Sequence, residues 1–354
     1  MATWATPPVI AALGAPPTGE RAARIARSPQ YRDGRFRNPV PPSPKPPVSP
    51  RDAMREWRRS NISRTPEAPI PIVTEQVPGE PASGVRITWY GHASALVEIE
   101  GHRILVDPIW SLRCSPSQLV GPRRLHPPPV PLRDLPTVDA VVISHDHCDH
   151  LDMATIRELA RRQRAPFLMP LGVGAHLERW GVSRDRIVEL DWGESQGVAG
   201  LRLTLTAARH FSGRAFTRDQ TLWGSWVLAG ARRRVFYTGD TGYFDGFAGI
   251  GREYGPFDAA LVQIGAYSEA WPDIHLTPED AVTAHLDVRG GLLIPVHWCT
   301  FVLAFHGWAE PAERIVQEAK ARGVPIAVPR PGQAVDVDAP PELDAWWELA
   351  RVAR

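Results

Sequence analysis

The sequence predicts an α/β (α+β) fold in which β-sheets pack face to face and helices cover their outer sides. Short apolar runs of β type follow one another closely over residues 85–108, which favours strands joined by hairpins. Helical patterns alternate with further strand-like runs up to residue 321. A chain of 354 residues, 43% of them hydrophobic, can form one large or two modest domains with a sizeable core.

The predicted elements begin where the composition changes abruptly, at Val85. We expect strands at 85–90, 94–100, 102–108, 138–144, 167–169, 201–207, 221–228, 234–238, 257–264 and 292–296. Helical patterns cover 153–162, 175–180 and 310–321. A further helix is expected after Thr277, because threonine caps a helix N-terminus, Pro278 suits the first position, and the carboxylates of Glu279 and Asp280 face the positive helix end.

Proline is concentrated at the N-terminus, where 17 of the 37 prolines precede Gly84. Because proline lacks the amide proton that sheets and helix interiors need, this part is expected to be an extended arm or strap. The sequence therefore predicts three parts: a Pro-rich, basic N-terminal arm at 1–84, a globular domain at 85–335 and a C-terminal tail at 336–354.

The net charge of +1 gives the whole molecule no strong sign that would attract nucleic acid. Residues 1–64 hold twelve basic and four acidic residues, a local charge of +8, which leaves −7 for the rest. The three cysteines form no CxxC pair, and the N-terminus lacks the pattern of a secretion signal. We therefore expect a soluble, cytoplasmic protein.

The segment 144–151, Ser-His-Asp-His-Cys-Asp-His-Leu, carries the strongest chemical signal. It directly follows the apolar run 138–144, where regular strand pairing ends and side chains can converge. Neutral imidazole and carboxylate are the ligands that hold zinc and similar divalent ions. The alternative is a solvated polar loop at the end of a strand.

His210, Asp240 and His297 also stand just past predicted strands. Each is able to bind a metal, although each taken alone is as well explained as an ordinary hydrogen-bonding residue. Their common placement favours one shared site.

The HDHCDH segment and these three later residues resemble the metallo-β-lactamase superfamily, whose metallo-β-lactamase fold is a four-layer αββα sandwich with a metal site at one end of its two sheets. The resemblance implies two divalent metal ions, zinc being the first choice. It also implies seven metal ligands: His145, His147 and His210 for one ion, Asp149, His150 and His297 for the other, and Asp240 bridging both.

Further segments are similar to the N-acyl-phosphatidylethanolamine-hydrolysing phospholipase D family, in order from about Tyr31 to Pro311. This resemblance makes 85–335 the catalytic domain. It implies that Asp107 is a supporting acidic residue beside the metals and that His275 lies near the scissile phosphate. With Asp149, these are the candidate catalytic residues. The segments are GRFRNPVP, TWYGHAS, VDPIW, SPSQLVGPRR, ELDWGES, LWGSW, TGDTGY, GPFD, IGAY, HLTPEDAV and VHWCTF.

Two positions depart from the animal enzymes of that family. Phe211 stands where they carry Trp, and Cys148 replaces an aromatic residue inside the metal motif. We interpret Cys148 as a small packing residue. These differences leave the metal core intact and concern the substrate.

The function implied is a dinuclear zinc-dependent hydrolase that cleaves a phosphodiester of an N-acyl-phosphatidylethanolamine-like phospholipid, as a phospholipase D does. One alternative is a metallohydrolase of the same fold acting on a non-lipid phosphodiester, a lactone or an amide. Another is a metal-binding module without turnover.

The expected partner is a phospholipid or other phosphodiester substrate, and nucleic acid is not expected. A short segment of the arm, with Met54, Arg55, Trp57, Arg58 and Arg59, suits peripheral contact with an anionic membrane, and equally a solvated helix packed on the body. A homodimer is compatible with the sequence.

Overall fold

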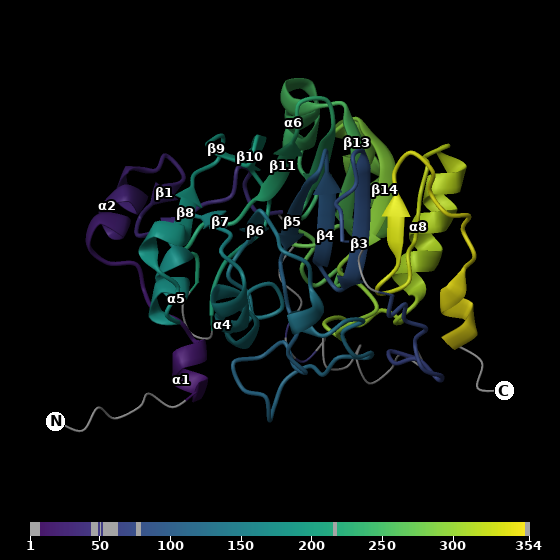
Figure 1. Cartoon of the computed structure of the whole chain (residues 1–354), viewed down its shortest axis with the longest axis horizontal. Helices are drawn as coiled ribbons and strands as arrows, with labels where there is room; N and C mark the ends of the chain where they lie inside the picture. Colours follow the sequence, from purple (N-terminus) through teal and green to yellow (C-terminus); the bar gives the residue numbers. More distant parts are fainter. Residues whose placement is uncertain are drawn as a thin grey trace.

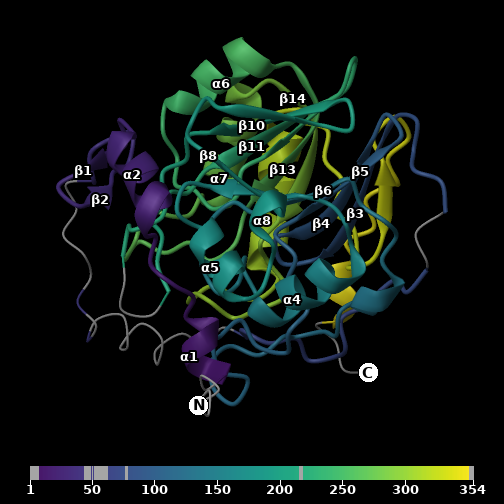
Figure 2. The same ribbon diagram turned by 60° about the vertical axis from the view of Figure 1, so that its left-hand side comes forward.

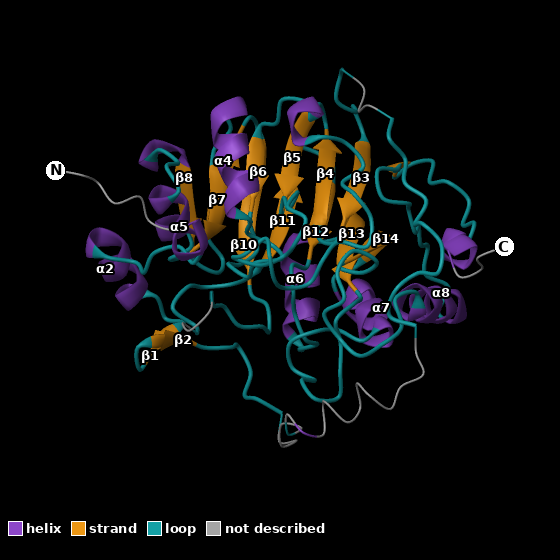
Figure 3. Cartoon of the chain, turned by 90° about the horizontal axis from the view of Figure 1, so that it is seen from below, coloured by secondary structure: helices purple, strands orange, loops and turns teal. Residues whose placement is uncertain are grey.

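Two β-sheets stacked on each other form the centre of the molecule, and helices cover both outer sides (Figure 1). The computed structural model describes residues 8–43, 49, 51, 63–75, 79–214 and 218–350. Figure 3 shows α4 (Met153–Arg162) and α5 (Gly174–Arg179) on one side of the strands. It shows α6 (Gly246–Tyr254), α7 (Pro278–Asp287) and α8 (Glu310–Ala321) on the other. The predicted four-layer αββα sandwich is confirmed.

The first sheet has seven strands. A hairpin run at its centre continues into parallel strands on one side. In spatial order the strands are β15 (Ala334–Asp336), β3 (Val85–Gly91), β4 (Ser94–Ile99), β5 (His102–Val106), β6 (Ala140–Val142), β7 (Phe167–Pro170) and β8 (Ile187–Leu190).

The second sheet has six strands, three of them parallel neighbours. In spatial order they are β14 (Gly290–Val296), β13 (Phe257–Gln263), β12 (Arg234–Tyr237), β11 (Ser225–Ala229), β10 (Leu201–Thr206) and β9 (Ser195–Val198). Short 3-10 helices lie at Leu132–Asp134, Arg184–Arg186 and Trp346–Ala350.

Alternation along the strands divides the core in two, because successive side chains of a strand point to opposite faces. In β4, Ala95 and Val97 belong to the cluster between the sheets, whereas Leu96 belongs to the cluster under α4 and α5. The sheet is therefore buried on both faces, which explains why β4 is apolar along most of its length.

The predicted helix bounds 153–162 and 310–321 are confirmed. Thr277 caps α7 as predicted, since its side chain accepts a hydrogen bond from the amide of Asp280. The predicted strand at 221–228 starts only at Ser225, because the residues before it belong to the loops around the site described below.

Parts of the N-terminal segment are regular and packed. It forms α1 (Pro8–Ala12), α2 (Gly19–Arg27) and the small hairpin β1 (Tyr31–Arg32) and β2 (Arg35–Phe36). Figures 1 and 2 place α2 near β8, where Arg21 pairs with Glu189 at 2.5 Å. Ile25 and Phe36 are buried in the core cluster between the sheets. Sequence reasoning missed these elements because they are short and lie among prolines, which favoured an extended arm.

The C-terminal segment also contributes to the core. β15 pairs with β3, and the side chains of Trp346 and Trp347 are buried against Trp298. The division into 1–84, 85–335 and 336–354 stays a prediction.

None of the helices in the described part of the chain has both the length and the apolar character that a membrane crossing requires. The arm segment proposed to contact membranes, with Trp57 at its centre, lies outside the described residues.

We expect Trp346→Ala to lower the free energy of unfolding by about 3–5 kcal/mol, the usual range for removing a buried tryptophan. The indole is fully buried, packs at a tilt against the Trp298 ring with centroids 5.3 Å apart, and donates to the carbonyl of Val328. Denaturant unfolding measures the loss. Leu349→Ala, at a side chain that is 67% exposed, is the control and should change little. A loss below about 1 kcal/mol for Trp346→Ala would mean that the tail is not part of the core.

Candidate metal centre

The strand directions bring the predicted ligands of the second sheet to one edge. β10 is antiparallel to β11, β11 is antiparallel to β12, and β12, β13 and β14 are parallel, so the carboxyl ends of β10, β12 and β14 lie together. His210, Asp240 and His297 come just after these three strands. The topology of the sheet therefore brings together three residues that lie far apart in the sequence.

The seven-stranded sheet contributes in the same way. β3 and β5 are both antiparallel to β4, and β5 is parallel to β6, so their carboxyl ends also share an edge. His92 follows β3, Asp107 follows β5, and residues 145–150 follow β6. The two edges meet in one pocket.

One group of side chains collects around His147. Its Nδ1 lies 2.8 Å from His145 Nε2 and 3.3 Å from His210 Nε2. With a carboxylate oxygen of Asp240, these ligand atoms all lie within 4.8 Å of one another. This is the first predicted ligand set, brought together as expected.

The second group collects around the carboxylate of Asp149. Its Oδ2 lies 2.9 Å from His92 Nε2, 3.3 Å from His297 Nε2 and 3.6 Å from His150 Nε2. These four residues form the second cluster that fits a metal ion. Three of them were predicted from the sequence, and His92 was not.

The sequence did hold a signal for His92. It lies just past a predicted strand, as the other ligands do, and inside the segment TWYGHAS. Its backbone is fixed on both sides, because its amide donates to Thr300 Oγ1 and its carbonyl accepts from Trp89 Nε1 and the amide of His297. Applying the strand-end argument to β3 would have found it.

Asp240 stands between the two groups. Its Oδ2 lies 3.1 Å from His150 Nε2, 3.2 Å from His297 Nε2, 3.8 Å from His210 Nε2 and 3.9 Å from His145 Nε2. One carboxylate oxygen thus faces imidazole nitrogens of both groups. This is the position that a bridging ligand would need.

The donor set of the pocket fits divalent cations. Within the described chain, His150 Nε2 and Asp240 Oδ1 are buried and have no hydrogen-bond partner. A buried polar atom without a partner is costly, and a cation bound by these atoms would remove that cost. Imidazole and carboxylate donors without thiolates match zinc and similar ions.

Protonation states in the pocket also favour cations. Burial, and then the neighbouring imidazoles, hold the pKa of His145 well below its usual value. Burial alone would raise the pKa of Asp240, but His150 and His297 hold it well below its usual value. Conversely the pKa of His297 is raised to about 9 despite burial, because Asp240 and Asp149 face it. The carboxylates therefore favour positive charge at the centre of the pocket.

Asp107 lies behind the pocket and holds one of its histidines. Its Oδ2 is 2.7 Å from His150 Nδ1, and it accepts hydrogen bonds from the amide of Ser144 and the hydroxyl of Tyr237. A carboxylate behind an imidazole fixes its tautomer and ring orientation. The geometry thus matches a supporting residue, which orients His150 and does not face the pocket interior.

His275 is brought to the site as predicted. Its ring lies 5.3 Å from that of His210 and 5.2 Å from that of His297, and it forms a third cluster with Asp240 and His297. Burial lowers its pKa to about 3, so it is neutral at pH 7.

Of the two carboxylates inside the pocket, Asp149 is the more accessible, with 16% of its side chain exposed against 2% for Asp240.

Three residues of the site have left-handed backbone conformations: His92 with φ 51°, Asp107 with φ 36° and His297 with φ 66°. Such a conformation costs a non-glycine residue about 1–3 kcal/mol, and it persists only where surrounding contacts enforce it. In each case it lies at the turn directly after a strand. The chain accepts this cost where side chains must turn into the pocket.

A second set of contacts supports the loop 145–150 from outside. The carboxylate of Asp146 points away from the metal groups and accepts from the Gly213 amide at 2.7 Å and the Thr221 hydroxyl at 2.9 Å. Arg214 donates to the carbonyls of Asp146 and Leu151 and, from the same guanidinium, to the carbonyl of Ala12. The N-terminal segment is thereby tied to the metal-binding loop.

Comparison with known proteins agrees with this geometry. Residues 102–298 match the family model described as a β-lactamase superfamily domain. The chain belongs to the β-lactamase superfamily. It is 36% identical over 253 residues to the N-acyl-phosphatidylethanolamine-hydrolyzing phospholipase D 1 of Caenorhabditis elegans, which covers 68% of this chain and 71% of that protein. The predicted relationship to that family is confirmed.

A relative in Mycobacterium tuberculosis, an uncharacterized protein, is 53% identical over 347 residues, 96% of this chain and 92% of its own length. Among solved structures, a metallo hydrolase from the archaeon Ignicoccus hospitalis matches with a TM-score of 0.56 and 26% identity, over 71% of this chain and 97% of that one. The present chain is thus a metal-dependent hydrolase of the β-lactamase superfamily, with histidine–aspartate clusters able to bind metal.

We expect His92→Gln to weaken binding of one metal equivalent by about tenfold or more, because the Asp149 carboxylate loses its closest imidazole. Competition of the protein with a chromophoric chelator measures the affinity. The control is His102→Gln, since His102 also lies near an aspartate, at 3.7 Å from Asp139, but is partly exposed and belongs to none of the metal-binding clusters. Unchanged affinity in both variants would exclude His92 from the metal centre.

We expect Arg214→Lys to lower metal affinity by about tenfold while the protein stays folded, because a compact ammonium cannot span the carbonyls of the loop and that of Ala12 as the planar guanidinium does. Arg186→Lys is a matched control: this arginine also donates to main-chain carbonyls, those of Ala160 and Ala165, away from the metal groups. If both variants bind metal equally well, Arg214 does not support the loop.

Proposed function

We propose that the protein is a dinuclear zinc-dependent phosphodiesterase of phospholipase D type, acting on an N-acyl-phosphatidylethanolamine-like phospholipid. Water would cleave the bond between phosphorus and the headgroup oxygen, which gives phosphatidate and an N-acylethanolamine. The observation that carries the proposal is the place of Asp240 Oδ2, between 3.1 and 3.9 Å from imidazole nitrogens of both clusters.

A centre for two cations is favoured over a structural zinc site. Structural zinc uses four ligands in a closed set, most of them thiolates. Here seven predicted ligands and His92 converge without a cysteine, and the Asp149 carboxylate is partly open to solvent. An accessible position beside buried ligands suits turnover better than a purely structural or binding role.

Two cations in this pocket would supply Lewis-acid activation of water and charge neutralisation at the phosphoryl oxygens. His145, His147 and His210 would hold one, Asp149, His150 and His297 the other, with Asp240 between them. Asp149 receives its orientation from His92 and His297, so it is placed to accept a proton from water. Asp107 keeps His150 in one tautomer.

His275 is assigned to the substrate side of the site. Since its pKa is lowered to about 3, it is a neutral imidazole at pH 7, and its buried Nδ1 has no partner in the described chain. A neutral ring donates one N–H, which suits a hydrogen bond to a phosphoryl oxygen where negative charge grows.

The phospholipid substrate is supported by the relationship to the phospholipase D of Caenorhabditis elegans and by the ordered motifs shared with that family. The alternative remains a hydrolase of the same fold acting on a non-lipid phosphodiester, a lactone or an amide. Peripheral membrane contact through the N-terminal arm, a homodimer and the absence of nucleic-acid binding stay predictions.

We expect His147→Ala and Asp240→Ala each to lower hydrolysis of N-acyl-phosphatidylethanolamine by at least about a thousandfold while circular dichroism stays unchanged, because each removes a donor at the centre of the pocket. Cys148→Ala is the control, since Cys148 lies between two predicted ligands but belongs to neither cluster. Release of N-acylethanolamine from mixed micelles measures the rate.

Full activity in a verified metal-free preparation would refute the mechanism. Two bound metal equivalents with turnover of only lactones, amides or non-lipid phosphodiesters would favour the alternative hydrolase. Two equivalents without turnover of any of these would favour the binding module.

A further inference from the structure

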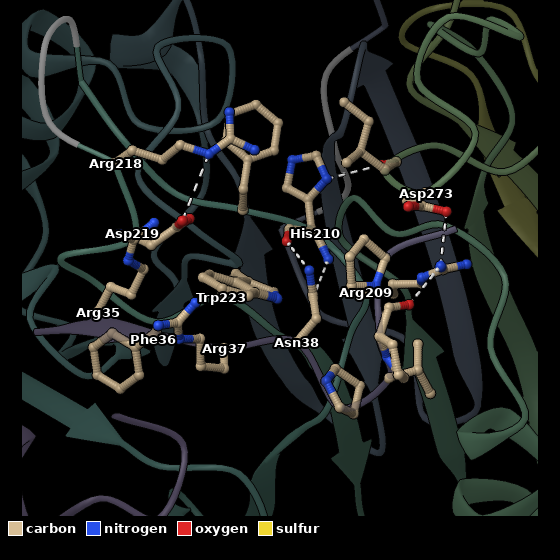
Figure 4. A pocket seen from close by; sticks show the side chains of 16 residues that line it. Arg35, Phe36, Arg37, Asn38, Arg209, His210, Arg218, Asp219, Trp223 and Asp273 are labelled. Atoms are coloured by element: carbon tan, nitrogen blue, oxygen red, sulfur yellow. Dashed lines mark hydrogen bonds and ion pairs between the residues drawn. The ribbon is translucent and has the colours of Figure 1, made fainter. Parts of the chain in front are cut away.

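A cavity of about 510 Å³ lies directly beside His210, between the N-terminal arm and the loop that follows β10 (Figure 4). Residues 35–42 form one wall and residues 209–211, 218, 219 and 223 the other, with 273 and 274 completing it. His210 itself is shared with the first metal cluster. This cavity, called the arginine groove below, therefore adjoins the proposed reaction centre.

The groove is rich in positive charge. Its lining includes four arginines against two aspartates, a net charge of +2, and the arginines are Arg35, Arg37, Arg209 and Arg218. In Figure 4 the Arg209–Asp273 pair and the Arg218–Asp219 pair lie on either side of His210. The surplus charge belongs to the arm, because Arg35 and Arg37 carry it.

The two aspartates are already engaged. Asp273 is 2.7 Å from Arg209 and accepts from the amide and the hydroxyl of Ser43. Asp219 accepts from the Ser212 amide and lies 3.5 Å from Arg218. Asp273 is thus paired with Arg209, and Asp219 interacts with both Arg218 and Arg35, so the groove keeps its net charge of +2.

The four arginines do not have the same task. Arg209 holds the arm in place, because it donates hydrogen bonds to the carbonyls of Pro41 and Tyr243. Arg218 lies over the ring of Phe211 at 4.3 Å, and that ring packs against His147 at 4.4 Å. Arg35 has no ion-pair partner among the described residues, and Arg37 pairs only with Asp33, whose side chain is 85% exposed. Such an exposed pair is weak and exchanges readily.

The arm is held rigidly at this place. The side chain of Asn38 accepts a hydrogen bond from the amide of His210 at 2.9 Å and donates one to its carbonyl at 2.8 Å. The segment that carries Arg35 and Arg37 is therefore fixed relative to a residue of the first metal cluster. The amide of Phe36 donates to the carbonyl of Asp219, which joins the two walls. The charges are thus presented at a fixed distance from the centre.

From this juxtaposition we propose that the arginine groove binds a second anionic group of the substrate, a phosphate or carboxylate distinct from the scissile phosphodiester. This inference rests on the proposed function. Guanidinium forks match carboxylate and phosphate oxygens, and charge-assisted hydrogen bonds of this kind are about twice as strong as neutral ones. The volume of the groove lies in the range of pockets that bind small ligands. The preferred substrate then carries an acidic group near the cleaved bond.

The test uses a matched pair of lipids in neutral vesicles, N-succinyl- and N-butyryl-phosphatidylethanolamine, which differ by one terminal carboxylate. We expect the metal-loaded enzyme to show a lower KM for the succinyl lipid. Arg35→Gln combined with Arg37→Gln should raise that KM about tenfold, with kcat unchanged and no effect on the butyryl lipid. Arg232→Gln, which removes one arginine charge at a side chain that is 84% exposed on another part of the surface, is the control and should change neither value.

The corresponding water-soluble headgroup diesters, without acyl chains, separate a bound anion from a charged membrane. The same selective rise of KM on the soluble succinyl diester supports the proposal. A rise that is equal for both lipids and absent for the soluble diesters would mean that the arginines touch the vesicle surface, which overturns it. An unchanged KM for the succinyl substrate in the double variant also overturns it.

If no phosphodiester is cleaved at all, the proposed function fails, and the groove is still tested by calorimetric titration with inorganic phosphate. Weaker phosphate binding by the metal-loaded double variant than by the parent and Arg232→Gln supports an anion site. Equal binding by all three contradicts it.

Discussion

The site depends on one carboxylate, that of Asp240, being shared by two sets of imidazoles. This oxygen is within 3.2 Å of nitrogens of His150 and His297 and within 3.9 Å of those of His145 and His210. A buried carboxylate needs positive charge around it, and so do the neighbouring Asp149 and Asp107. The pocket is therefore organised around cationic charge, and the surrounding shell of hydrogen bonds keeps each donor in place.

The sandwich makes this arrangement possible through strand direction. Each sheet sends several carboxyl ends to the same edge, so residues from 92 to 297 meet although more than 200 positions separate them. Hydrogen bonds from residues outside the sandwich core also support the metal centre. Arg214 connects the loop 145–150 to Ala12 through hydrogen bonds, and the Asn38 side chain forms a hydrogen bond with the backbone of His210. Residues before 85 thus support the metal centre, although all of its donors follow Val85.

The sequence was informative where local chemistry is strong. Helices α4 and α8 and the cap of α7 were predictable because apolar periodicity and capping act over a few residues. Helix α6 escaped notice because it contains three glycines, and the structure explains Gly251: a Cβ there would lie 2.2 Å from the carbonyl oxygen of Asp287 in α7. Among site residues, the metal motif was recognisable and His92 could have been found from its place just after β3, whereas Asp146 and Arg214 depend on contacts that only the topology creates.

Locating the metal in crystals of the zinc-loaded protein, by anomalous scattering at the zinc edge, tests the two-cation site most directly. Two peaks are predicted, one among His145, His147 and His210 and one among Asp149, His150 and His297, with the Asp240 carboxylate in contact with both. A single peak that leaves Asp240 without contact, or metal bound only elsewhere on the surface, would contradict the central claim.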